Sequence, residues 1–320
     1  MRTPRRFVAL ALGLLASCTG GPAATRGAPA RAPAREPAGH RDRLAVGERI
    51  ALPLAELFVP SGFAAPADGA VPLCVHFQGA LAAAEENFAR MERGGVLLAS
   101  TIQGRSSAFA APYRDPEAFH ALLAAGEAAL SARAGRPMHF DPLVITFWSA
   151  GYGAVRELLA DAALFARIDA LVSADSIYAT VVADDVRAPC IDDMTGFVRF
   201  AQAAARGDKT FVLAHGRYQT DYASTAETAA LLRAAVAAHH LPVLEFTERG
   251  VPIAFASHQR GFHCYEFDEA TAGIHVDCLY FVPELVRRHV RARPATASVD
   301  EVGASAQTGA DQPADRTRRL

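Results

Sequence analysis

The chain has 320 residues, of which 51% are hydrophobic and 21% are charged. This composition supplies a substantial core for one large domain or two small ones, and it excludes a disordered chain and a many-span membrane protein. Because 32 basic and 34 acidic side chains leave a formal net charge of -2, no global positive field is available to bind a nucleic-acid backbone, and a nucleic-acid partner is disfavoured.

The first residues have the pattern of an export signal. Arg2, Arg5 and Arg6 precede an apolar run over 7–15 that is too short to span a bilayer as a mature helix. The run ends in Leu-Ala-Ser followed by Cys18, which resembles the signal of bacterial lipoproteins.

The lipoprotein resemblance implies where the protein resides. A signal peptide over 1–17 would be removed, and Cys18 would become the lipid-bearing N-terminus. Its acyl chains would then anchor the protein to a membrane of the bacterial cell envelope. The stretch 18–43 consists mainly of Ala, Pro, Gly, Arg and Thr without apolar periodicity, which predicts a flexible linker.

The rest of the chain divides into a folded part and a tail. Residues 44–292 form one predicted domain of ordinary enzyme size. Residues 293–320 return to Ala, Ser, Thr, Asp and Gln, which predicts a disordered tail.

Short apolar runs alternate with helical stretches across the predicted domain, a pattern typical of an α/β fold with a mostly parallel sheet and helices on both faces. The predicted strands are 71–77, 95–101, 143–148, 170–174, 210–214 and 262–267. The predicted helices are 117–134, 153–166, 195–206, 225–239 and 276–290. Ser224 and Glu227 have the spacing of a capping box at the start of the fourth helix.

One segment carries the strongest chemical signal. The apolar strand 143–148 leads directly into Ser149, Ala150 and Gly151, and a helix follows at once. This is the layout of a nucleophile elbow, a tight turn that lifts a serine hydroxyl above a sheet and beside a helix N-terminus. Phe147 occupies the place where the usual G-x-S-x-G pattern has its first glycine.

With this segment the chain resembles the α/β-hydrolase superfamily, and the resemblance covers nearly all of 44–292. Upstream, a strand ends in Val-His-Phe-Gln-Gly over 75–79, where lipases and esterases of that superfamily carry an oxyanion segment. The resemblance implies that a backbone amide of Phe77 or Gln78 joins that of Ala150 in binding a tetrahedral oxyanion.

The superfamily orders its triad as serine, acid, histidine, which leaves two candidate acids downstream of Ser149. Asp175 stands at the tip of the strand 170–174, whereas Asp221 lies seven residues past the strand 210–214. We prefer Asp175, and Asp221 remains the alternative acid.

Four histidines compete for the role of base. The superfamily places this residue between its last strand and its C-terminal helix, which favours His275. His215 ends a strand and is the main rival, whereas His258 and His263 are less favoured.

These residues predict a serine hydrolase of carboxylesterase type that cleaves an ester-like acyl bond of a small-molecule substrate. Ser149 attacks, His275 accepts its proton and Asp175 orients the imidazole. No metal or organic cofactor is implied. The rival hypothesis is a catalytically silent, hydrolase-like lipoprotein that acts as a binding protein in the cell envelope.

Overall fold

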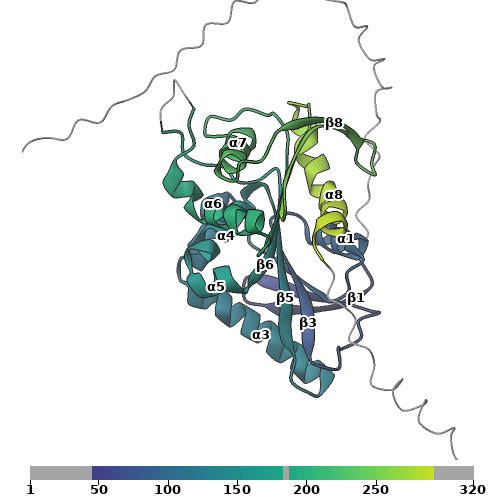
Figure 1. The fold of residues 1–320 in the computed structure, drawn as a ribbon. Coiled ribbons are helices and arrows are strands. Elements are labelled where there is room, and N and C mark those ends of the chain that lie inside the picture. The colour runs from purple at the N-terminus through teal and green to yellow at the C-terminus, as the bar shows by residue number, and fades with distance from the viewer. Residues whose placement is uncertain (1–44, 183–186, 292–320) are drawn as a thin grey trace, which may run out of the picture. The chain divides into compact units, whose positions relative to one another are not determined.

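A computed structural model describes residues 45–182 and 187–291, which form a ten-stranded sheet flanked by helices (Figure 1). The strand order across the sheet is β1-β2-β4-β3-β5-β6-β7-β10-β9-β8. The strands are β1 (Gly47–Leu52), β2 (Ala55–Pro60), β3 (Ala70–Phe77), β4 (Val96–Ser100), β5 (His139–Trp148), β6 (Ile168–Ala174), β7 (Thr210–His215), β8 (Leu241–Phe246), β9 (Pro252–Gln259) and β10 (Phe262–Glu266).

The middle of the sheet is parallel and its edges are antiparallel. Strands β4, β3, β5, β6, β7 and β10 pair in parallel, whereas β1 and β2 on one side and β9 and β8 on the other pair antiparallel. All side chains of the parallel core alternate between two covered faces, so these strands read as nearly continuous apolar runs.

Helices cover both faces of the sheet. They are α1 (Leu81–Met91), α2 (Ser106–Ala110), α3 (Pro116–Ala134), α4 (Tyr152–Ala160), α5 (Ala162–Arg167), α6 (Ile191–Arg206), α7 (Thr225–Ala235) and α8 (Ala272–His289), with 3-10 turns η1 (Ala111–Arg114) and η2 (Ser149–Gly151). Residues of α1 and α8 pack with one set of strand side chains, and residues of α3 to α7 pack with the other. On β3, for example, Cys74 belongs to the core layer with α1 and α8, whereas its neighbour Val75 belongs to the core layer with α3 to α7.

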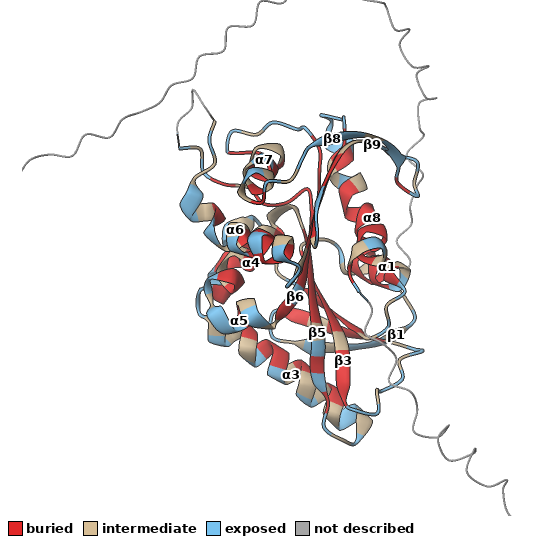
Figure 2. Ribbon diagram, viewed as in Figure 1, coloured by how far each residue is buried: buried red, intermediate tan, exposed pale blue. Residues whose placement is uncertain are grey.

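The burial pattern shows which strands form the core. Figure 2 shows the central strands and α8 largely buried, whereas β8 is mostly exposed. The six strands expected from apolar runs are the six parallel strands, so this prediction of an α/β fold is confirmed. The four antiparallel edge strands and the helices α1 and α2 were not predicted.

Several predicted helix boundaries were wrong. The expected helix over 153–166 is two helices, because the extended backbone of Asp161 ends α4 and its carboxylate caps α5 at Leu164 N. The C-terminal helix begins at Ala272 and not at Val276. The fourth predicted helix ends at Ala235 but starts as expected, with the complete capping box of Ser224 and Glu227.

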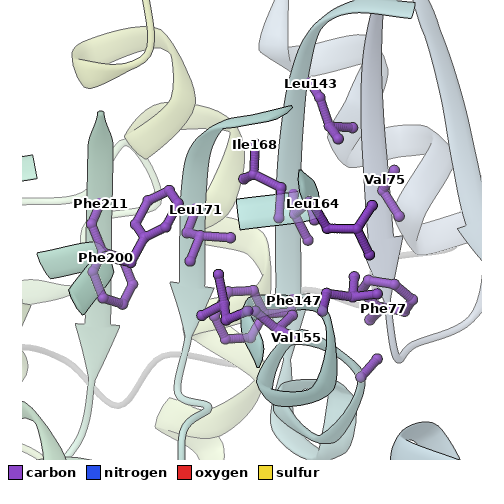
Figure 3. Packing of buried hydrophobic residues seen from close by; sticks show 14 of the residues in the cluster. Val75, Phe77, Leu143, Phe147, Val155, Leu164, Ile168, Leu171, Phe200 and Phe211 are labelled. Carbon is purple, nitrogen blue, oxygen red and sulfur yellow. The ribbon is translucent and has the colours of Figure 1, made fainter. Parts of the chain in front are cut away.

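Phe147 is part of the packed interior. Its side chain is fully buried, and its ring lies 6.3 Å from that of Phe197 on α6. Figure 3 shows it beside Val155 of α4, among other apolar side chains of the same cluster. The core layer with α3 to α7 therefore accommodates a bulky residue two positions before Ser149.

The predicted signal peptide 1–17, the linker 18–43, Cys18 and the tail 293–320 lie outside the described residues. Among the helices that the structure describes, none combines the length and the apolar character that crossing a bilayer requires.

Candidate active site

A cavity of about 1180 Å³ opens at the carboxyl ends of the parallel strands. Its lining includes Gln78 after β3, Ser149 after β5, Asp175 after β6, Tyr218 after β7 and Thr271 after β10. The crevice outside the carboxyl ends of the strands is where open α/β sheets bind their ligands. The cavity is therefore the candidate active site.

Ser149 occupies a tight turn between β5 and α4. Its φ of 50° lies in the left-handed region that non-glycine residues seldom adopt. Two glycines let the following helix approach the sheet: a Cβ on Gly151 would lie 2.5 Å from the carbonyl oxygen of Phe77, and one on Gly153 would lie 2.1 Å from that of Ser106. Both positions thus require glycine for close packing, and the serine stands at the start of a helix.

Asp175 and His275 are in direct contact although a hundred positions separate them in the chain. The Nδ1 atom of His275 lies 2.7 Å from Oδ2 of Asp175. The other carboxylate oxygen accepts a 2.6 Å hydrogen bond from the Thr225 hydroxyl and a 3.3 Å hydrogen bond from the Gly216 amide. Asp175 is therefore fixed by three donors, of which the sequence interpretation had identified only His275.

This environment keeps Asp175 ionised. Burial by itself raises the pKa of its carboxyl group, but the hydrogen bonds from His275 and Thr225, with the nearby imidazoles, outweigh burial and leave the pKa below its ordinary value. A carboxylate held in this way favours the imidazole tautomer of His275 that carries its proton on Nδ1.

Strained backbone accompanies the carboxylate. Asp175 has a φ of 39° and Ile177 a φ of 74°, which is rare for a β-branched residue. The Thr228 hydroxyl holds the carbonyl oxygen of Ile177 at 2.7 Å, and the side chain of Ile177 is fully buried. Strain of this kind persists only where the surroundings over-determine it, and it concentrates at functional sites.

Trp148 holds the helix turn that carries His275. Its indole N–H donates a 2.7 Å hydrogen bond to the carbonyl oxygen of His275, and the two rings lie 4.6 Å apart. Trp148 is the only tryptophan of the chain, and its position next to Ser149 was the one sequence signal for this contact. His275 itself lies in the first turn of α8 and not in the preceding loop, because α8 begins earlier than expected.

The three candidate oxyanion residues differ in their placement. Gln78 and Ala150 line the cavity, and Gln78 has a left-handed φ of 73°. Phe77 is fully buried and does not line the cavity. The neighbouring His76 binds Thr146 Oγ1 at 2.8 Å through Nδ1, and burial lowers its pKa to about 4, so it is a neutral residue that links β3 and β5.

The alternative acid lies at the same cavity, whereas the other three histidines lie away from it. Asp221 is exposed at the cavity, whereas Asp175 contacts the imidazole. His215 is buried, with Nδ1 3.0 Å from the carbonyl oxygen of Gly216 and Nε2 3.9 Å from Glu266. His258 and His263 contact each other across β9 and β10, with Nδ1 atoms 2.9 Å apart. Of the four histidines, His275 alone lines the cavity.

Within 45–182 and 187–291, no three His, Cys, Asp or Glu side chains are arranged to hold a metal ion.

Comparisons with known proteins add three solved structures at low identity. No protein-family model matches the chain, and no curated protein matches it. The ferric enterobactin esterase of Salmonella typhimurium is 13% identical with a TM-score of 0.40 over 73% of this chain, which spans 55% of that enzyme's length. A soluble variant of the monoglyceride lipase of Saccharomyces cerevisiae is 11% identical with a TM-score of 0.39, covering 80% of this chain and 99% of that one.

An α/β serine hydrolase homologue of Coxiella burnetii is 13% identical with a TM-score of 0.38, covering 78% of this chain and 99% of that one. The sheet of this chain has a parallel core with helices on both faces, and a serine stands on a strand-to-helix turn ahead of an aspartate and a histidine. The described part of the chain therefore has an α/β fold, with the order of elements that the resemblance to α/β-hydrolases predicts.

Proposed function

We propose that the protein is a serine hydrolase that cleaves an ester-like acyl bond through Ser149, His275 and Asp175. One observation carries the proposal. The buried Asp175 carboxylate contacts His275 Nδ1 at 2.7 Å at the edge of the cavity that Ser149 also lines. A serine, an imidazole and a carboxylate that orients the imidazole are the components of nucleophilic acyl transfer.

The reaction would proceed in two halves. His275 Nε2 takes the proton of the Ser149 hydroxyl as its oxygen attacks the ester carbonyl, and the collapse of the tetrahedral intermediate breaks the bond to the alcohol. His275 gives this proton to the departing alcohol, and the acyl group stays bonded to Ser149. Water then attacks the acyl group while His275 takes one of its protons. As the bond between the acyl carbon and Ser149 Oγ breaks, His275 gives this proton to Oγ, which restores the serine and releases the carboxylic acid.

The negative oxygen of the intermediate needs two donors. The Ala150 amide stands next to the nucleophile at the start of a helix, where backbone N–H groups point outward and the helix dipole favours negative charge. The left-handed backbone at Gln78 supports its amide as the second donor, in preference to that of the buried Phe77.

A fluorophosphonate probe tests the proposal directly, because only an activated serine reacts quickly with it. We expect one covalent adduct, on Ser149, found by mass spectrometry of the digested protein. Heat-denatured protein is the control and should not react. A folded protein that stays unlabelled would favour the catalytically silent binding protein.

We also propose that the enzyme is exported and lipid-anchored through Cys18. The support is the apolar run that ends in Leu-Ala-Ser-Cys and the linker composition that follows it. Cys18→Ala should leave the protein unacylated or uncleaved at this position. Intact mass and detergent partitioning measure the change, and values identical to those of the parent protein would refute the anchor.

A further inference from the structure

Tyrosine is concentrated in the cavity that Ser149 lines. Four of the seven tyrosines of the chain contribute to its wall, and none of the phenylalanines in the described parts of the chain does. They come from three separate segments: Tyr152 opens α4, Tyr178 follows β6, and Tyr218 and Tyr222 follow β7. Aromatic side chains therefore converge on one space from distant parts of the sequence.

Three of these rings form a continuous array. Tyr152 meets Tyr178 with ring centroids 5.6 Å apart and planes at 63°, and Tyr178 meets Tyr222 at 5.2 Å and 88°. The Tyr152 hydroxyl donates to Ser106 Oγ at 3.1 Å, and the Tyr178 hydroxyl donates to the carbonyl oxygen of Asp175 at 3.2 Å. The array is thus fixed directly to the segment that carries Asp175.

Tyr222 is the last ring of this array and is exposed to solvent. Half of its surface is exposed, as is half of that of Tyr218. Its carbonyl oxygen accepts a 2.9 Å hydrogen bond from Arg187, which secures the backbone at this point. An exposed ring on a secured backbone is a preorganised surface, so a ligand that packs on it does not have to order it.

The same wall offers little to an alkyl chain. Within 45–182 and 187–291, Val181 is the only branched aliphatic residue that lines the cavity, and the other aliphatic ones are alanines. Most of the remaining lining residues carry hydroxyl, amide or charged groups. The cavity has room for more than an ester group: its volume of about 1180 Å³ lies above the roughly 300–1,000 Å³ of typical small-molecule sites, and Ser149 and Tyr222 both line it.

We propose that this cavity selects esters that carry an aromatic ring, which packs against Tyr178 and Tyr222 while the ester group lies at Ser149. The assignment of the reacting bond rests on the proposed function, whereas the ring site rests on the tyrosine array alone. Ring pairs at this spacing are favoured in edge-to-face and offset arrangements beyond the area they bury. A saturated ring of similar size lacks that contribution.

The test compares aromatic esters with saturated counterparts of similar shape. Methyl phenylacetate against methyl cyclohexylacetate places the ring on the acyl side, and benzyl acetate against cyclohexylmethyl acetate places it on the alcohol side. We expect the aromatic member of at least one pair to have a kcat/KM about two- to tenfold higher. An apolar pocket without ring recognition would prefer the more hydrophobic cyclohexyl compounds, and that result with both pairs would overturn the proposal.

Two variants assign the preference to the array. Tyr222→Phe keeps the ring and should keep the preference, whereas Tyr222→Leu should abolish it. Binding of the same esters to Ser149→Ala, followed by ligand-observed NMR, separates ring recognition from catalysis. A phenyl preference in binding supports the ring site even if the wild-type protein hydrolyses none of the esters, and equal or weaker binding of the aromatic members rejects it.

Discussion

Ser149→Ala is expected to lower turnover of small activated esters by several orders of magnitude. The hydroxyl oxygen of Ser149 is the only atom of the proposed triad that bonds to the acyl group. Without it, only oxyanion binding and substrate positioning contribute to the rate. The turn itself should survive, because its geometry depends on the packing of Gly151 and Gly153 and not on the serine hydroxyl. Initial rates on a 4-nitrophenyl ester of a short acid measure the loss.

A matched control separates this effect from damage to the fold. Ser61 is an exposed serine in the turn after β2, so Ser61→Ala makes the same chemical change away from the cavity. Its turnover should equal that of the wild type. Activity retained by Ser149→Ala in a protein with an unchanged thermal unfolding curve would place the chemistry at another residue.

Asp175→Asn should lower turnover on the order of 10⁴-fold, by analogy with the asparagine variant of the serine-protease triad. An amide in place of the carboxylate favours the wrong tautomer of His275, because its N–H₂ group presents a donor to Nδ1. Asp221→Asn is the matched comparison, since this exposed aspartate lines the same cavity without being the residue that contacts the imidazole. Its effect on kcat should be far smaller, and the reverse ranking of the two variants would refute Asp175 as the orienting acid.

Asp175→Asn should also change the stability of the folded state in a pH-dependent way. Because the pKa of Asp175 lies below its ordinary value of 3.8, the ionised carboxylate stabilises the folded state at pH values above about 4. This contribution is lost as the pH falls through the lowered pKa of the folded state. The difference in unfolding temperature between wild type and Asp175→Asn should therefore be largest near neutral pH and should narrow in strong acid.

The parallel core could be predicted because its signal is local. Each of its strands is buried on two faces and forms an apolar run, and such a run is visible in the sequence without knowledge of its neighbours. The edge strands lack that signal. β8, for example, is exposed at five of its six positions, and its pairing with β9 depends on a partner that the sequence does not identify.

The candidate site could likewise be predicted only where its signal lies in neighbouring residues. The turn at Ser149 could be recognised because the strand, the small residues and the helix are contiguous. Phe147 looked like a departure from the pattern, and only the packing of its ring against Phe197 shows why a large side chain fits there. The tyrosine array could not be predicted either, because its members come from three segments that only the folded sheet brings together.

By itself, the sequence determined the order of the parallel strands along the chain and the position of the serine turn, since both follow from neighbouring residues. The tertiary structure decided which carboxylate meets which imidazole. Asp175 and Asp221 both follow strands, and His215 and His275 both stand at strand or helix ends, so local patterns could not separate them. The 2.7 Å contact between Asp175 and His275 joins residues a hundred positions apart. It forms because β6, which ends just before Asp175, pairs with β5, and because α8, which carries His275, packs on side chains of β6.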